Sequence, residues 1–148
     1  MTRQEKYPDT QTFHYHNENP RNRITVDCVP RAIARGTGID YNTVVMQLAD
    51  LQVHTGYAEP YDRYLAFRGW VKRKQPRKDD NTKYTGKEFC RLLQKHLGRG
   101  ISRAKGIDIS DHIIAHIGGG HIVAIIDGKV NDIWDSTDGC IGNYWVKP

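Results

Sequence analysis

Three residues that lie far apart in the chain have side chains suited to nucleophilic catalysis. Cys28 lies in "ITVDCVPRAIARGTG", where a helix begins, and His121 opens the apolar run "HIVAII" directly after three glycines. Asp135 ends the segment "KVNDIWD". A thiol at a helix N-terminus ionises more easily, because unpaired N–H groups and the helix dipole favour an anion there. A nucleophile, a base and an orienting carboxylate form the arrangement that activated-cysteine catalysis requires.

The residues alone leave two questions open. Cys28 also fits a small, buried apolar residue, which is a common environment for a free cysteine. The hairpin that joins the two β segments also leaves two carboxylates available. A strict two-residue turn at Asp127-Gly128 places His121 opposite Trp134 and puts Asp132 on the face of the histidine. A one-residue bulge brings Asp135 to the histidine instead.

The order Cys at a helix start, His at a strand start and Asp at the end of the next strand resembles papain-like cysteine peptidases. The resemblance is closest to bacteriocin-processing peptidases and transglutaminase-like relatives. Small uncharacterised phage and prophage proteins also look similar, with an "NP…DC" opening and a "WDS" ending. We expect Asp135 to orient the imidazole, with Asp132 as the alternative, because Asp135 lies 14 residues after His121 and this spacing is closer to that of the resembled families.

The resemblance also implies an oxyanion-hole residue and a reaction. The resembled families often have Gln six residues before the cysteine, and Asn22 occupies that place in "NRITVDC". The implied function is a small thiol hydrolase, a peptidase or isopeptidase acting on a protein or peptide substrate. The alternatives are a catalytically inactive binding protein on the same scaffold, such as a phage-encoded inhibitor or host-factor binder, and an amide acyltransferase. In the same families a Trp shields the His–carboxylate hydrogen bond, a role that Trp134 or Trp145 could take.

The periodicity of the chain predicts the elements that must position these residues. A helix is expected from Asp27 or Cys28 to Arg35, with Pro30 in its first turn. After about residue 111 the apolar period changes to that of strands. The fold class expected is therefore α+β and papain-like, with a helical N-terminal half packed on a C-terminal antiparallel β-sheet. The predicted helices are 27–35, 40–51, 59–67 and 85–98, and the predicted strands are 12–16, 69–73, 112–117, 121–126, 129–135 and 141–146.

Composition bounds the function classes. A chain of 148 residues predicts a single domain, 1–148, and the longest apolar run is too short to span a bilayer. Three widely spaced cysteines without CxxC spacing argue against a disulfide framework and a structural zinc site. With no secretory signal in the first residues, we expect a cytoplasmic protein of a bacterium or phage-infected host cell. No cofactor and no metal ion are expected.

A basic stretch is the one indication of a further partner. The net charge is +5, and much of the excess lies in "VKRKQPRKDDNTK", between Lys72 and Lys78. A short charge run of this kind is usually a solvated segment. Contact with nucleic acid through Lys72–Lys78 is the alternative, although no aromatic residues are interleaved with it.

Overall fold

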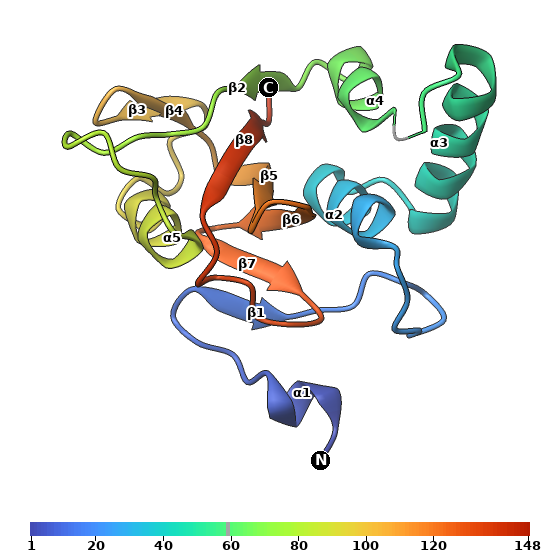
Figure 1. Ribbon diagram of the computed structural model, residues 1–148, viewed down its shortest axis with the longest axis horizontal. Coiled ribbons are helices and arrows are strands. Elements are labelled where there is room, and N and C mark those ends of the chain that lie inside the picture. Colours follow the sequence, from blue (N-terminus) through green and yellow to red (C-terminus); the bar gives the residue numbers. More distant parts are fainter. Residues whose placement is uncertain (59) are drawn as a thin grey trace.

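The computed structural model describes residues 1–58 and 60–148, and it shows an α+β fold (Figure 1). None of its described helices is long and apolar enough to cross a membrane. The helices are α1 (Arg3–Lys6), α2 (Cys28–Thr37), α3 (Tyr41–Thr55), α4 (Tyr61–Phe67) and α5 (Gly86–Gln94). The strands are β1 (Phe13–Tyr15), β2 (Val71–Arg73), β3 (Ser102–Ala104), β4 (Ile107–Ile109), β5 (His112–Ile117), β6 (His121–Ile126), β7 (Lys129–Asp132) and β8 (Ile141–Val146).

A six-stranded sheet with the order β1-β7-β6-β5-β8-β2 forms the centre of the fold. All neighbouring strands in it are antiparallel except β1 and β7, which pair in parallel. Both edge strands come from the first half of the chain, so the sheet is not built from the C-terminal half alone. β3 and β4 form a separate hairpin, which periodicity did not predict.

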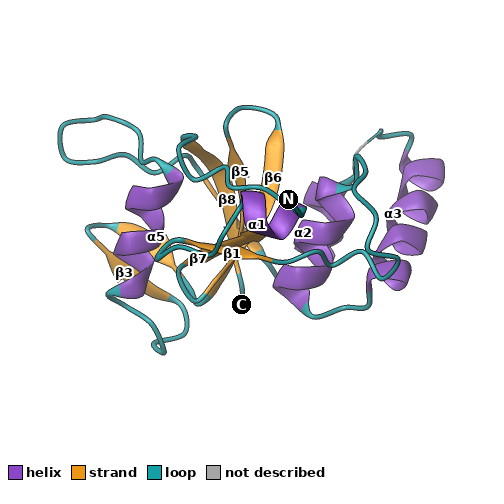
Figure 2. Ribbon diagram, turned by 90° about the horizontal axis from the view of Figure 1, so that it is seen from below, coloured by secondary structure: helices purple, strands orange, loops and turns teal. Residues whose placement is uncertain are grey.

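Helices cover both faces of this sheet (Figure 2). On one face, α2, α3 and α4 bury an apolar cluster that includes Ile33, Leu65 and Trp145. On the other face, α5 and the β3–β4 hairpin bury a second cluster, which includes Phe89 and Ile109. Successive residues of β5 and β6 pack alternately in the two clusters, because side chains in a strand alternate between the two faces of the sheet.

Most of the predicted elements are present, and their ends show where local signals were insufficient. Thr85 caps α5 through a capping box with Glu88, as its sequence favours. The helix ends at Gln94 rather than near residue 98, because the N–H groups of Lys95 and His96 bond three residues back and tighten the last turn. The helix predicted over 59–67 is α4, and residue 59 lies outside the described residues.

Candidate active site

Cys28 is the first residue of α2 and is half-buried. Asp27 precedes it at the N-cap position, but its side chain makes no capping hydrogen bond to the helix. Pro30 lies in the first turn and has no N–H to satisfy. The helix start therefore leaves the backbone N–H groups of Cys28 and Val29 beside the sulfur, without partners from the cap.

His121 contacts both Cys28 and Asp132. It is the first residue of β6, and its Nε2 lies 2.5 Å from Oδ2 of Asp132, the last residue of β7. The thiol of Cys28 lies near enough to the same imidazole and to the backbone N–H of Ile122 for both groups to favour its thiolate form. Because Nε2 faces the carboxylate, Nδ1 is the ring nitrogen left for the sulfur.

These contacts favour a thiolate–imidazolium pair. The hydrogen bond to His121 lowers the pKa of the Cys28 thiol, and it outweighs burial, which acts in the opposite direction. Burial disfavours the charged form of His121, but its hydrogen bonds to Asp132 and Cys28 outweigh burial and raise its pKa to about 9. Both shifts act in the direction of a negative sulfur beside a positive ring.

The carboxylate that contacts His121 is Asp132 and not Asp135, the residue expected to orient it. The β6–β7 hairpin has the strict two-residue turn, with φ of 50° at Asp127 and 77° at Gly128, and Ile126 pairs with Lys129. Positive φ at both positions is the geometry of a type I′ turn, which needs no bulge. β7 ends at Asp132, and Asp135 instead accepts hydrogen bonds from the backbone N–H and hydroxyl of Thr137.

Trp134 packs against the imidazole, with its ring centroid 5.0 Å from that of His121. This is the neighbour that the strict hairpin register predicts. Trp134 therefore lies where it can limit water access to the hydrogen bond between His121 and Asp132. Trp145 lies instead in the apolar cluster under α2 and α4.

The structure does not bring Asn22 into the site. Asn22 is exposed, has a positive φ of 54°, and is held in a turn by the hydrogen bond from its N–H to the carbonyl of Asn19. No side-chain hydrogen bond of Asn22 is present within the described chain. The prediction from the six-residue spacing is wrong because the segment before Cys28 is a loop. In a loop, the number of residues between two positions does not determine where the first side chain points.

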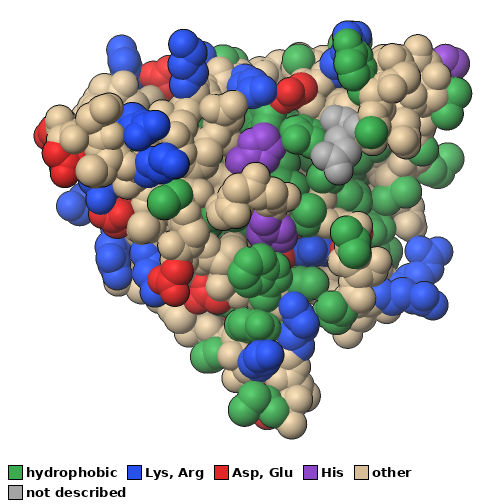
Figure 3. All heavy atoms as spheres, in the orientation of Figure 1, with side chains coloured by type: hydrophobic (Ala, Val, Ile, Leu, Met, Phe, Trp, Pro, Cys, Tyr) green, Lys and Arg blue, Asp and Glu red, His purple; other side chains and the backbone are tan. Residues whose placement is uncertain are grey.

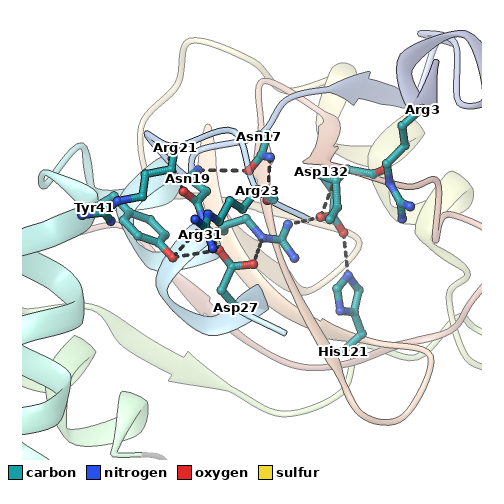
Figure 4. Close-up of polar contacts among 11 residues, drawn as sticks. Arg3, Asn17, Asn19, Arg21, Arg23, Asp27, Arg31, Tyr41, His121 and Asp132 are labelled. Atoms are coloured by element: carbon teal, nitrogen blue, oxygen red, sulfur yellow. Dashed lines mark hydrogen bonds and ion pairs between the residues drawn. The ribbon is translucent and has the colours of Figure 1, made fainter. Parts of the chain in front are cut away.

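Arg31 is the residue of the site that sequence reasoning missed. It lies on α2 one turn after Cys28, is 6% exposed, and joins two carboxylates (Figure 4). Its Nε donates to Oδ1 of Asp27 at 2.7 Å, and its Nη1 donates to Oδ1 of Asp132. The i, i+4 spacing of Asp27 and Arg31 in "DCVPR" was the available signal.

Asp27 is in turn held by neutral donors. Asn19 donates to its Oδ2 at 3.1 Å, and the Tyr41 hydroxyl donates to the same oxygen at 2.7 Å. Burial and the bond to Asp27 raise the pKa of Tyr41 to about 12, so this hydroxyl keeps its proton. The side chain of Asp27 therefore positions Arg31 and leaves the helix start uncapped.

The other cysteines and histidines have different environments. Cys90 is fully buried in α5, and burial raises the pKa of its thiol to about 12. Cys140 is exposed. His116 contacts the Tyr61 hydroxyl at 3.1 Å and lies edge-on to Trp145. His16 pairs with Glu18, and within the described chain no group of three or more potential ligands could hold a metal ion.

An apolar cavity of about 290 Å³ opens beside Cys28. It lies between the start of α2, α3 and the segment before α4, where Figure 3 shows hydrophobic side chains at the surface. Gln52 is the only polar side chain in its wall apart from the thiol, among the residues that the structure describes. The lining residues are Val26, Cys28, Val29, Pro30, Val45, Leu48, Ala49, Gln52, Ala58 and Pro60.

Comparison with known proteins identifies no relative of this chain. No protein-family model matches the chain, and neither a curated protein nor a solved structure is detectably similar to it.

Proposed function

We propose that this protein is a small papain-like thiol hydrolase that cleaves a peptide or isopeptide bond. The observation that carries the proposal is the continuous contact from Cys28 through His121 to Asp132, with the sulfur at the start of a helix. These are the nucleophile, the base and the orienting group of covalent catalysis.

The reaction follows from the groups in place. The Cys28 thiolate attacks the carbonyl carbon, and the electron pair of the C=O bond moves onto oxygen. His121 gives its proton to the leaving amine as the C–N bond breaks, which leaves a thioester on Cys28. His121 then takes a proton from water, whose oxygen attacks the thioester. Collapse of that intermediate releases the acid, and the sulfur leaves as thiolate.

The oxyanion donors in this proposal are backbone groups rather than Asn22. The N–H groups of Cys28 and Val29 lie at the uncapped start of α2, since the side chain of Asp27 is bonded to Arg31. Donors of this kind are worth roughly 3 to 4 kcal/mol of transition-state stabilisation in known hydrolases.

The apolar cavity indicates the substrate. Its wall includes Cys28 itself, so a side chain bound there belongs to a residue close to the bond that is cut. A wall formed almost entirely by apolar groups favours an apolar side chain, because a charged one would lose its hydration without gaining a partner.

Alkylation with iodoacetamide across pH tests the thiolate directly. Because the pKa of Cys28 is lowered and that of His121 is raised to about 9, Cys28 should remain reactive at a lower pH than an ordinary thiol. At pH 7 an ordinary thiol is only about 3% ionised, so Cys28 should react roughly tenfold faster or more than the exposed Cys140. Rates are read per cysteine by mass spectrometry. Equal, slow labelling of both would support a non-catalytic binding protein.

A panel of peptide vinyl sulfones tests catalysis and the cavity together. The wild type should be modified at Cys28 fastest by probes with an apolar residue next to the reactive group, and His121→Ala should lose this reaction. Ala49→Phe, which fills the cavity wall, should slow the apolar probes while leaving iodoacetamide labelling unchanged. Met46→Phe is the matched control, because Met46 is 71% exposed on the same helix and does not line the cavity.

A further inference from the structure

A basic groove lies between two segments that are distant in the sequence. The end of β2 with the loop after it forms one wall, and the β3–β4 hairpin forms the other; Figure 1 shows where these segments lie. The groove has a volume of about 400 Å³. Figure 3 shows Lys and Arg side chains gathered over this end of the molecule. The basic groove is defined by Arg73, Lys74, Arg77, Arg103 and Lys105.

Most of this positive charge is not neutralised. Of the described residues that line the groove, Asp108 alone is acidic, and it forms ion pairs with Arg73 and Arg103. Lys74, Arg77 and Lys105 are exposed and have no ion pair within residues 1–58 and 60–148. The groove therefore holds five cations against one carboxylate, which favours a partner with several negative charges.

The lining distinguishes between two kinds of acidic partner. Protein–protein interfaces need an apolar centre, whereas surfaces that contact nucleic acids are polar and strongly positive. Ile107 and Tyr144, which line this groove, offer almost no exposed surface, since Ile107 is 8% exposed and Tyr144 is 2% exposed. Without an accessible aromatic ring, the groove also lacks a stacking platform for single-stranded bases.

We infer that the basic groove binds the phosphodiester backbone of a double-stranded nucleic acid without reading its sequence. Arginine forks and lysine ammonium groups suit phosphate oxygens, and they lie on both walls of a concave surface. The groove lies against the apolar cluster on the α5 face of the sheet, whereas Cys28 packs against the cluster on the α2 face. Binding there is therefore independent of the thiol chemistry.

Fluorescence anisotropy with labelled 20-base-pair duplexes of DNA and of RNA tests this inference, with poly-glutamate of similar charge as the comparison. Binding in the range of about 10⁻⁴ to 10⁻⁶ M is expected at physiological salt for a duplex, with log Kd changing linearly with log salt concentration. The groove variant is Lys74→Gln with Arg77→Gln and Lys105→Gln. It should bind at least tenfold more weakly, and its salt slope should fall by about 3.

The control variant removes the same charge elsewhere, through Lys6→Gln with Arg91→Gln and Lys95→Gln. These side chains are exposed and do not line the groove. All six positions lie at the surface, and far-UV circular dichroism confirms folding before binding is compared. The inference is overturned if the two triple variants bind a duplex equally well, if neither duplex binds the wild type, or if poly-glutamate binds more tightly than both. Cys28→Ala should bind like the wild type, which separates this result from the proposed hydrolase activity.

Discussion

The charges at the centre of the site alternate in sign from Asp27 through Arg31, Asp132 and His121 to Cys28. Hydrogen bonds and ion pairs join Asp27, Arg31, Asp132 and His121 in turn. The imidazole of His121 in turn lowers the pKa of the Cys28 thiol. Arg31 and Asp132 are almost fully buried, so each of these charges requires its partner. We therefore expect the reactivity of the sulfur to depend on residues that do not touch it.

Asp132→Asn should remove the counter-charge of the imidazolium without changing side-chain size. The pKa of His121 should then fall from about 9, and Cys28 alkylation at pH 7 should slow about tenfold. Loss of the corresponding carboxylate in a serine triad costs about 10⁴ in rate, and a loss of similar order in hydrolysis is expected here.

Asp135→Asn is the matched control for that substitution. Asp135 bonds only to Thr137 among the described residues, so its loss should cost about 1 kcal/mol of stability and leave the alkylation rate unchanged. Slower alkylation in Asp135→Asn than in Asp132→Asn would show that Asp135, and not Asp132, orients the imidazole of His121.

Arg31→Met should raise the pKa of Cys28, because the guanidinium adds a positive charge that favours the thiolate. The pH midpoint of Cys28 alkylation should move upward. Stability should fall by about 3–5 kcal/mol, since Asp27 and Asp132 lose a buried partner. Arg31→Lys, which keeps the charge, should recover most of the midpoint and part of the stability.

Arg35→Met is the control that distinguishes the effect of Arg31 on Cys28 from the loss of any positive charge on α2. Arg35 lies one turn further along the helix and bonds the side chain of Asn131, the neighbour of Asp132. The alkylation midpoint should be unchanged in this variant. An equal shift in both variants would show that Arg31 acts only through net charge.

At the scale of elements, the β6–β7 hairpin decides which carboxylate meets the histidine. Its turn residues Asp127 and Gly128 both have positive φ, which fixes a two-residue loop and hence the register. Gly128 also lies close to α5, where a Cβ would be 2.4 Å from Cγ of Gln94 and 3.1 Å from the carbonyl oxygen of Cys90. Glycine is therefore favoured at position 128 both by its positive φ and by the close approach of α5.

Gly128→Ala should destabilise the protein for both reasons, by about 2–4 kcal/mol in urea unfolding. Gly106→Ala is the matched control, because Lys105-Gly106 forms a turn of the same kind between β3 and β4, with φ of 51° and 78°. Nothing lies within 4 Å of a Cβ at Gly106, so only the conformational cost of about 1–2 kcal/mol applies. Equal losses would remove the argument for contact with α5.

At the scale of the whole molecule, one sheet separates two apolar clusters. Phe13 of β1 is fully buried in the cluster on the α5 face, whereas Trp70 and Trp145 lie in the cluster on the α2 face. If residues 1–148 fold as the single domain that their length predicts, a cavity in one cluster must weaken the other equally.

Phe13→Ala should therefore lower the urea midpoint measured by tryptophan fluorescence and by far-UV circular dichroism to the same extent. The expected cost is about 3–5 kcal/mol. Phe67→Ala, at a side chain that is 78% exposed, should change stability by less than about 0.5 kcal/mol. Two separated transitions in Phe13→Ala would contradict a single cooperative domain.

The local features of this protein can be predicted from its amino-acid sequence. The start of α2 at Cys28, the capping box at Thr85 and the four strands after residue 111 follow from caps, turns and periodicity, which act over a few residues. Local signals also placed Cys28 at a helix start and His121 at a strand start, whereas the expectation that the two meet came from the resemblance to papain-like peptidases.

Only the tertiary structure decided the partners of those residues. Asp132 rather than Asp135 meets His121, Arg31 joins two buried carboxylates, and Asn22 lies outside the site. The parallel pairing of β1 with β7 was likewise not predictable from local sequence patterns. Each of these contacts depends on strand register or on the direction of a loop. A shift of one residue in register moves a side chain to the other face of the sheet, and short-range sequence patterns do not distinguish the two registers.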